Sequence, residues 1–231
     1  MKIIIANWKM NGSVNFARKF IREINQVDSQ NLVIVCPPAA LLDRFSNFRY
    51  YIGAQDCFYR KKGSFTGEHS PLLLKEMGCK YAIIGHSERR TNFNETDNIV
   101  FKKWKAAIRY GLVPIVCIGE SLHDEGNWQG AISQQLKLFP KKLSNGTIFA
   151  YEPIGCIGTG VAMSLDRIRT VLEFVRGLLN DERVSLLYGG SVNSQNARQI
   201  IDKAGADGIL IGKTSLNIQD FKKIILLGNS L

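Results

Sequence analysis

A glutamate at the end of a predicted strand is the strongest chemical feature of this sequence. The apolar run at 147–151 is typical of a buried strand, and Glu152 follows it directly. Pro153 fixes the backbone φ angle and ends the strand, and the next eight residues contain three glycines and no charge. A carboxylate joined to such a segment suggests a base under a movable lid. Taken alone, the stretch is better explained as an ordinary strand end with a solvated glutamate, and only the rest of the chain favours the base.

Other polar or flexible residues follow other predicted strands. Asn7 and Lys9 come after the first strand, His86 after the fourth, and glycine turns at 189–190 and 212 after the last two. Singly, each has an ordinary explanation, such as a surface lysine or a buried histidine satisfied by hydrogen bonds. Together they suit proton transfer beside the carbonyl of a phosphorylated substrate, since the glycine turns expose backbone N–H groups to an anion.

The elements that must position these residues alternate regularly along the chain. Short apolar runs without polar alternation predict parallel strands covered on both faces. We place these strands at 2–6, 32–36, 51–55, 81–84, 113–118, 147–151, 185–188 and 208–211. Apolar residues at helical spacing fall between them. These stripes are Ala17, Phe20, Ile21 and Ile24; Val100, Trp104, Ala107 and Ile108; and Leu165, Ile168, Leu172, Val175 and Leu179.

Eight strand–helix units in 231 residues predict one (β/α)8 barrel that forms a single domain over residues 1–231. A doubly wound open sheet is the alternative, but the first strand is followed by no glycine fingerprint for a dinucleotide. Ser164 and Asn193 are placed to cap helices. In a barrel, the loops after the strands build the active site, so the residues named above should meet on one rim.

Composition favours a cytoplasmic protein without a metal site. The five cysteines are odd in number and contain no CxxC pair, which argues for free thiols in a reducing compartment and against zinc. The apolar run at the N-terminus is too short for a signal peptide, and we expect no membrane span. The net charge of +10 is spread along the chain, with basic clusters at 60–62, 102–103, 141–142 and 222–223 that we interpret as solvated helix faces. We therefore expect no nucleic-acid partner, although a positive field would steer a small anionic substrate.

Seven motifs in order along the whole chain resemble the triosephosphate isomerase family. They are ANWKMN at 6–11, GSFTGE at 63–68, IGHSERR at 84–90, CIGE at 117–120, AYEP at 150–153, IGTG at 157–160 and YGGSVN at 188–193. One such motif would be weak, but the ordered set is highly specific. The resemblance implies interconversion of dihydroxyacetone phosphate and D-glyceraldehyde 3-phosphate through an enediolate, in glycolysis and gluconeogenesis, with no cofactor.

The resemblance also implies a role for each site residue. Glu152 would move the proton between two carbons, helped by burial that raises its pKa, and His86 would polarise the carbonyl as a neutral imidazole. This pairing and the closing lid are the established pattern of that family, so neither is an independent prediction. Lys9 and Asn7 would bind the reacting oxygen, and Lys9 would also face the phosphate. Supporting contacts would come from Glu88, which orients Lys9, and from Cys117. Backbone donors to the phosphate would come from Gly158, Gly189, Gly190, Ser191, Gly212 and Lys213.

A long loop after the third strand resembles the segment that docks into a second subunit in that family. It contains Phe65, Thr66, Gly67 and Glu68, and its aromatic residues would be a liability on a monomer. We therefore expect a homodimer in which Gln55 and Thr66 support the neighbouring lysine loop.

The sequence departs from the family pattern in three respects. The lid has Gly155 where tryptophan is usual and Cys156 where alanine is common, and its far hinge at 161–163 is apolar. Lys213 occupies a position that is often a second glycine. None of these changes removes a catalytic group.

Two other functions fit the sequence less well. A Schiff-base aldolase is disfavoured because Lys9 follows the first strand and the aldolase mechanism leaves Glu152 unexplained. A catalytically silent barrel that binds anionic surfaces is disfavoured by the joint presence of Asn7, Lys9, His86 and Glu152.

Overall fold

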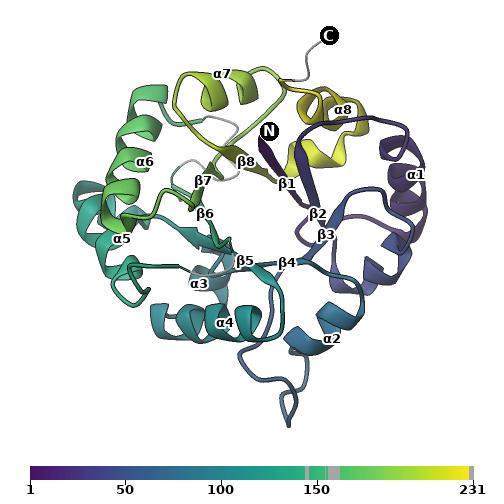
Figure 1. Ribbon diagram of the computed structural model, residues 1–231, viewed down its shortest axis with the longest axis horizontal. Coiled ribbons are helices and arrows are strands. Elements are labelled where there is room, and N and C mark those ends of the chain that lie inside the picture. Colours follow the sequence, from purple (N-terminus) through teal and green to yellow (C-terminus); the bar gives the residue numbers. More distant parts are fainter. Residues whose placement is uncertain (144–145, 154, 156–161, 229–231) are drawn as a thin grey trace.

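The computed structural model describes residues 1–143, 146–153, 155 and 162–228. Eight parallel strands close into a barrel in sequence order, with the first strand paired to the eighth (Figure 1). This confirms the predicted (β/α)8 barrel and excludes the open sheet. The strands are β1 (Ile3–Asn7), β2 (Leu32–Cys36), β3 (Tyr51–Ala54), β4 (Tyr81–Ile84), β5 (Val113–Ile118), β6 (Ile148–Tyr151), β7 (Ser185–Tyr188) and β8 (Gly208–Ile211).

Strand positions agree with the sequence prediction to within one residue at either end. The differences are a shift of β1 by one residue, a β3 that ends before Gln55, and a β6 that starts after Thr147. In each case the strand ends where its hydrogen bonding to the neighbouring strand ends. A run of apolar residues does not show where that hydrogen bonding stops.

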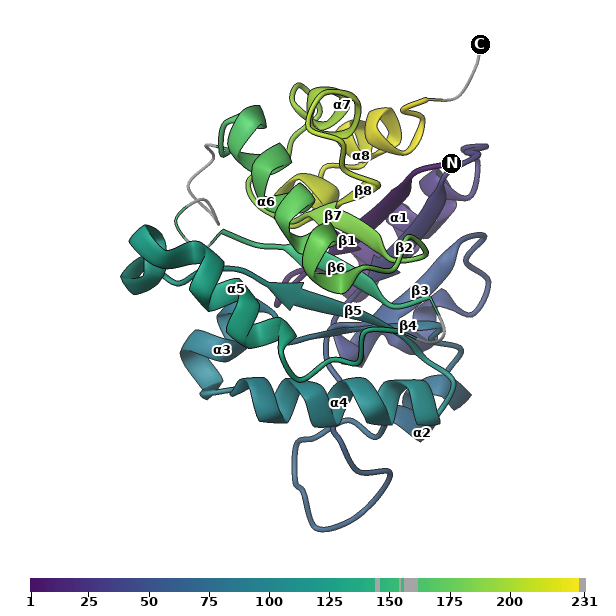
Figure 2. The same ribbon diagram turned by 60° about the vertical axis from the view of Figure 1, so that its left-hand side comes forward.

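Eight α-helices surround the barrel in the described part of the chain (Figures 1 and 2). They are α1 (Val14–Ile24), α2 (Pro71–Glu76), α3 (Ser87–Phe93), α4 (Asp97–Arg109), α5 (Trp128–Leu136), α6 (Leu165–Leu179), α7 (Ala197–Asp202) and α8 (Ile218–Ile225). Short 3-10 helices cover Ala39–Phe45, Leu122–Asn127 and Lys213–Leu216. No helix among the described residues is long and apolar enough to cross a membrane.

The core has two layers because strand side chains alternate between the barrel interior and the helices. Ile5, Ile83, Ile115 and Leu187 belong to the interior cluster. Neighbouring residues such as Ile4 belong to the larger cluster between strands and helices. Both layers exclude water, which explains why the strands have apolar residues on both faces.

Of the two residues predicted to cap helices, one does so and the other caps a turn. Ser164 caps α6, and its hydroxyl accepts a hydrogen bond from the N–H of Arg167 at 3.3 Å. Asn193 does not cap a helix directly, because α7 begins only at Ala197. Its side chain instead caps the turn that leads into α7 by accepting from the N–H of Asn196 at 2.9 Å.

The prediction that the basic pairs are solvated is wrong for Lys103. This side chain is 2% exposed, and its Nζ lies 2.6 Å from Asp56 Oδ2 and also pairs with Glu95 Oε1. Arg89 pairs with the same two carboxylates. Adjacent helical residues point in different directions, so Lys102 can face solvent while Lys103 faces acids that distant segments supply.

Candidate active site

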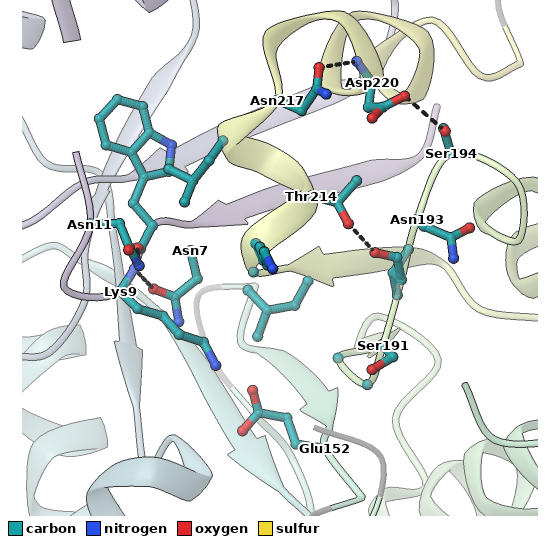
Figure 3. A pocket seen from close by; sticks show the side chains of 18 of the residues that line it. Asn7, Lys9, Asn11, Glu152, Ser191, Asn193, Ser194, Thr214, Asn217 and Asp220 are labelled. Carbon is teal, nitrogen blue, oxygen red and sulfur yellow. Dashed lines mark hydrogen bonds between the residues drawn. The ribbon is translucent and has the colours of Figure 1, made fainter. Parts of the chain in front are cut away.

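The residues predicted to do chemistry line one cavity at the carboxyl ends of the strands. The cavity holds about 790 Å³, and its walls include Asn7 and Lys9 after β1, His86 after β4, Glu152 after β6, residues 189–191 after β7, and Gly212 and Lys213 after β8. Figure 3 shows the Lys9 and Glu152 side chains extending toward one another, with Ser191 farther along the same opening. The barrel therefore brings together residues that are far apart in the sequence.

Glu152 is held at the end of β6 with its carboxylate inside the protein. Its N–H donates to the carbonyl of Ile118 at 2.7 Å, and the side chain is only 2% exposed. Oε1 lies 3.1 Å from Nε2 of His86, and Oε2 accepts a hydrogen bond from the N–H of Ser87 at 3.0 Å. Both carboxylate oxygens therefore have a partner at the start of α3.

The pKa of Glu152 moves in the direction opposite to the sequence prediction. Burial raises it, as expected, but His86, the Ser87 N–H and the charge of Lys9 favour the ionised form and bring the pKa below 4.5. The prediction considered desolvation alone and could not include the partners that α3 provides. In this arrangement Glu152 is ionised but is a weaker base than a buried, unpartnered carboxylate.

His86 is the N-terminal cap of α3. Its Nδ1 accepts a hydrogen bond from the N–H of Glu88 at 3.2 Å, which leaves Nε2 to carry the proton in the neutral ring. Burial lowers the pKa of His86, while the Glu152 carboxylate facing Nε2 raises it, with a net rise. The rise depends on Glu152 remaining beside the ring, so it would diminish if Glu152 moved away.

Lys9 is fixed at both its backbone and its side chain. Its φ of 53° lies in the left-handed region, which is uncommon for a residue with a Cβ. Its N–H donates to Asn7 Oδ1 at 3.0 Å, and its Nζ lies 2.6 Å from Glu88 Oε1. The contact with Glu88 holds the ammonium at the cavity.

Gln55 contacts the lysine loop of its own chain. Its Nε2 donates to the carbonyl oxygens of Lys9 at 2.8 Å and of Cys36 at 2.9 Å. Support of the lysine loop by Gln55 is thus present within one chain, and its part in a dimer stays a prediction. The closed barrel places the ends of β1, β2 and β3 side by side, so the contact forms within one chain.

The glycine turn after β7 is needed because Glu152 packs against it. A Cβ on Gly189 would lie 2.9 Å from Cγ of Glu152, and one on Gly190 would lie 2.2 Å from the Tyr188 hydroxyl oxygen. These distances are too short for ordinary contacts. The turn can therefore bring its backbone close to the cavity only with glycine at both positions.

The far side of the cavity combines predicted and unpredicted groups. Lys213 lies on it and is not among the described residues with positive φ. Asn217 and Asp220 also line it, although the sequence drew no attention to them. Asp220 accepts a hydrogen bond from the Ser194 hydroxyl at 3.1 Å (Figure 3). Gly158 and the rest of the expected lid, at 154 and 156–161, lie outside the described residues.

Cys117 belongs to the buried cluster in the barrel interior and contacts Glu152. Its thiol is buried, and burial raises its pKa well above 9.0, with a further contribution from the charge and hydrogen bond of Glu152. A neutral thiol is therefore the form that contacts the carboxylate. Glu120, for which the sequence suggested no role, is also buried and accepts a hydrogen bond from the Tyr151 hydroxyl at 2.8 Å.

The loop between β3 and α2 projects from the body of the molecule (Figure 2). Phe65 packs on Phe58 with ring centres 4.6 Å apart, yet it remains 37% exposed. Thr66, Gly67 and Glu68 at its tip are exposed as well. A cavity of about 310 Å³ beside this loop is lined by Lys9, Met10, Gln55 and Phe93, and both Met10 and Phe93 are exposed.

Comparison with known proteins gives one family. The model of the family described as "Triosephosphate isomerase" matches residues 2–227. Three similar curated proteins are called "Triosephosphate isomerase". That of Thermoanaerobacter pseudethanolicus is 41% identical, covering 96% of this chain and 98% of its own. That of Clostridium botulinum (strain Loch Maree) is 39% identical with the same coverage. That of Dictyoglomus turgidum is 35% identical, covering 97% of this chain and 98% of its own.

Proposed function

The chain belongs to the triosephosphate isomerase family, and from that membership we propose that Glu152 is the base of its reaction. The enzyme interconverts dihydroxyacetone phosphate and D-glyceraldehyde 3-phosphate. The observation that carries the proposal is the 3.1 Å contact of the buried Glu152 carboxylate with His86 in a cavity that also contains Lys9.

Glu152 would remove a proton from the carbon beside the substrate carbonyl and return it to the carbonyl carbon. Between these steps the substrate is an enediolate, whose negative charge lies on the two oxygens. His86 would donate its Nε2–H to the former carbonyl oxygen, since Nδ1 already accepts from Glu88. It would recover a proton at Nε2 from the neighbouring hydroxyl oxygen, which becomes the new carbonyl oxygen. The Lys9 ammonium and the Asn7 amide would face the same charge, which lowers the free energy of the transition state.

Substrate binding would increase the basicity of Glu152. A substrate oxygen that bonds His86 Nε2 competes with Glu152 Oε1 for that position. When Glu152 turns toward the substrate, it loses the His86 and Ser87 contacts that now lower its pKa, while burial still raises it. The carboxylate would thus become a stronger base only in the complex.

The phosphate would bind on the side of the cavity formed by the turns after β7 and β8. Gly189, Gly190, Ser191, Gly212 and Lys213 line this side. Backbone N–H groups from such turns suit a phosphate dianion, and this is a common phosphate position in (β/α)8 barrels. The Lys213 ammonium would add a screened attraction. Gly158 remains a predicted further donor.

A homodimer is the assembly that best explains the projecting loop. Phe65, Met10 and Phe93 leave apolar surface exposed close to the 310 Å³ cavity beside Lys9. A partner's Thr66–Gly67–Glu68 tip in that cavity would cover this surface and brace the lysine loop from outside. Association would therefore support both stability and catalysis.

A reducing compartment such as the cytoplasm fits the cysteines. Cys36, Cys57, Cys79 and Cys117 are free and buried. Such thiols behave as small apolar core residues when they stay reduced.

Isomerisation in deuterium oxide tests the proposed base. We expect the wild-type enzyme to convert dihydroxyacetone phosphate to aldehyde that carries solvent deuterium at carbon 2, observed by proton NMR, because the proton on Glu152 can exchange with solvent. Glu152→Gln should lose both turnover and label incorporation. Continued incorporation in the folded variant would assign the base to another residue.

A further inference from the structure

A separate cavity lies outside the barrel, on the outer face of α4. It holds about 300 Å³ and is lined by Tyr59, Lys102, Lys105, Ala106, Arg109 and Tyr110. Tyr59 belongs to the loop between β3 and α2, and the other residues belong to α4 and its C-terminal end. Figures 1 and 2 show α4 in the outer layer of helices, separated from the barrel interior by the strands.

The cations of this cavity share one side of α4. Lys102, Lys105 and Arg109 are separated by three and then four positions, which places them on one helix face. Like charges at these spacings repel and destabilise the helix. No acidic residue lines the cavity, and within the described parts of the chain none of the three cations forms an ion pair.

Two carboxylates beside α4 are already used on the inner side of the helix. Asp56 and Glu95 pair with the buried Lys103, which leaves the outward cations without a protein counterion. The result is a concave site with three positive groups and a buried Ala106 among its walls. Such a site gains most from a ligand that brings more than one negative charge.

Aromatic contacts hold the lysines in place. Lys102 Nζ lies 5.6 Å from the ring centre of Tyr59, and Lys105 Nζ lies 4.7 Å from that of Phe101. The Tyr59 ring is itself packed on Phe58, with ring centres 4.2 Å apart. The walls are therefore partly ordered before any ligand binds, which reduces the entropy lost on binding.

We propose that this cavity binds a small polyphosphate anion, either inorganic or the polyphosphate part of a nucleotide. The planar guanidinium of Arg109 matches two oxygens of one phosphate, and the two ammonium groups can bind a second. The volume is near the lower end of small-molecule sites and suits a compact ligand better than a nucleic-acid strand. The site is distinct from the catalytic cavity and shares no lining residue with it.

The test is a titration of the isotopically labelled enzyme, in its native assembly, with inorganic pyrophosphate at constant ionic strength. Amide NMR signals separate the two sites, because residues 102–110 report on this cavity while Gly190, Ser191 and Lys213 report on the catalytic one. We expect saturable shifts at 102–110. In the variant Lys102→Gln/Lys105→Gln/Arg109→Gln, pyrophosphate affinity at these amides should fall at least about tenfold, since three charge-assisted contacts are lost. The same titration with a nucleoside triphosphate then shows whether the inorganic ligand or the nucleotide binds more tightly.

A matched control removes the same net charge elsewhere. Lys19, Lys141 and Lys142 are exposed and lie outside the cavity, so Lys19→Gln/Lys141→Gln/Lys142→Gln should retain the wild-type affinity. If both triple variants lost pyrophosphate affinity equally, net charge alone would explain the loss and the proposal would be overturned. Shifts confined to catalytic amides, shifts at 102–110 that do not saturate, or saturation by a single-stranded oligonucleotide but not by pyrophosphate would overturn it as well.

Discussion

The pKa of a buried carboxylate depends on which groups face it, and Asp56 differs from Glu152 in this respect. Burial raises the pKa of Asp56 from 3.8 to about 6, although Lys103 and Arg89 oppose the rise, and Glu95 adds to it. An acid whose pKa is higher in the folded state takes up a proton on folding. The stability it contributes is fully present below pH 3.8 and is lost as the pH rises through about 6.

We therefore expect Asp56→Asn to flatten the pH dependence of stability between pH 4 and 6.5. The shift corresponds to a change on the order of 3 kcal/mol across that window in wild type. The substituted amide would keep an oxygen that accepts from Lys103 but would not titrate. Urea unfolding at several pH values measures the effect, with the exposed Asp43→Asn as control. An unchanged slope in Asp56→Asn would show that other groups set the pH dependence.

Lys213 gives a second test at a single residue. Its backbone φ is not positive, so lysine is not strained there. Lys213→Gly should leave stability unchanged or lower it by roughly 0.5–1 kcal/mol, because glycine loses more backbone entropy on folding. KM should rise a few-fold at low salt and less at high salt, since the ammonium attraction is screened. A marked increase in thermal stability would contradict this account.

At the scale of elements, the strands were the most predictable part and the helix faces the least. A continuous apolar run such as Val113–Ile118 identifies a strand because both of its faces are buried. The same run then places Gly119 and Glu120 at the rim. By contrast, the sequence predicts a solvated Lys103, because its partners Asp56 and Glu95 lie on other segments that only the fold places beside it.

The same distinction applies to the site. Residue types at strand ends predicted which groups would meet, namely Lys9, His86 and Glu152. They did not predict that the Ser87 N–H and His86 would lower the pKa of Glu152, nor that Gln55 would bond Lys9 in its own chain. Pairings between loops depend on the curvature of the closed sheet, which local sequence does not report.

The turn after β7 carries a prediction of its own. In Gly189→Ala the new Cβ would lie 2.9 Å from Cγ of Glu152 and must displace that side chain or the turn. A shift of about 1 Å in a reacting group can reduce the rate on the order of 10²-fold. We expect a large loss of kcat with the fold retained by circular dichroism. Gly177→Ala, at an open helical position, is the control and should keep wild-type kcat.

At the scale of the whole molecule, the projecting loop predicts that activity depends on association. Thr66→Arg places a long cation at the exposed tip and should weaken a dimer by on the order of 100-fold in dissociation constant, as burying an unpaired charge is costly. Sedimentation and specific activity should fall together on dilution. Asn47→Arg, on an exposed turn, is the control. A monomeric wild-type enzyme with full activity at all concentrations would contradict the dimer.

The kinetics of Glu152→Asp test the central claim most directly. The variant keeps the charge but withdraws the carboxylate by about one methylene group, and a misplacement near 1 Å can cost on the order of 10²-fold in rate. We predict a loss of that size in kcat, with KM almost unchanged, because the phosphate contacts do not involve Glu152. A folded Glu152→Asp enzyme with kcat close to that of wild type would contradict the assignment of Glu152 as the catalytic base.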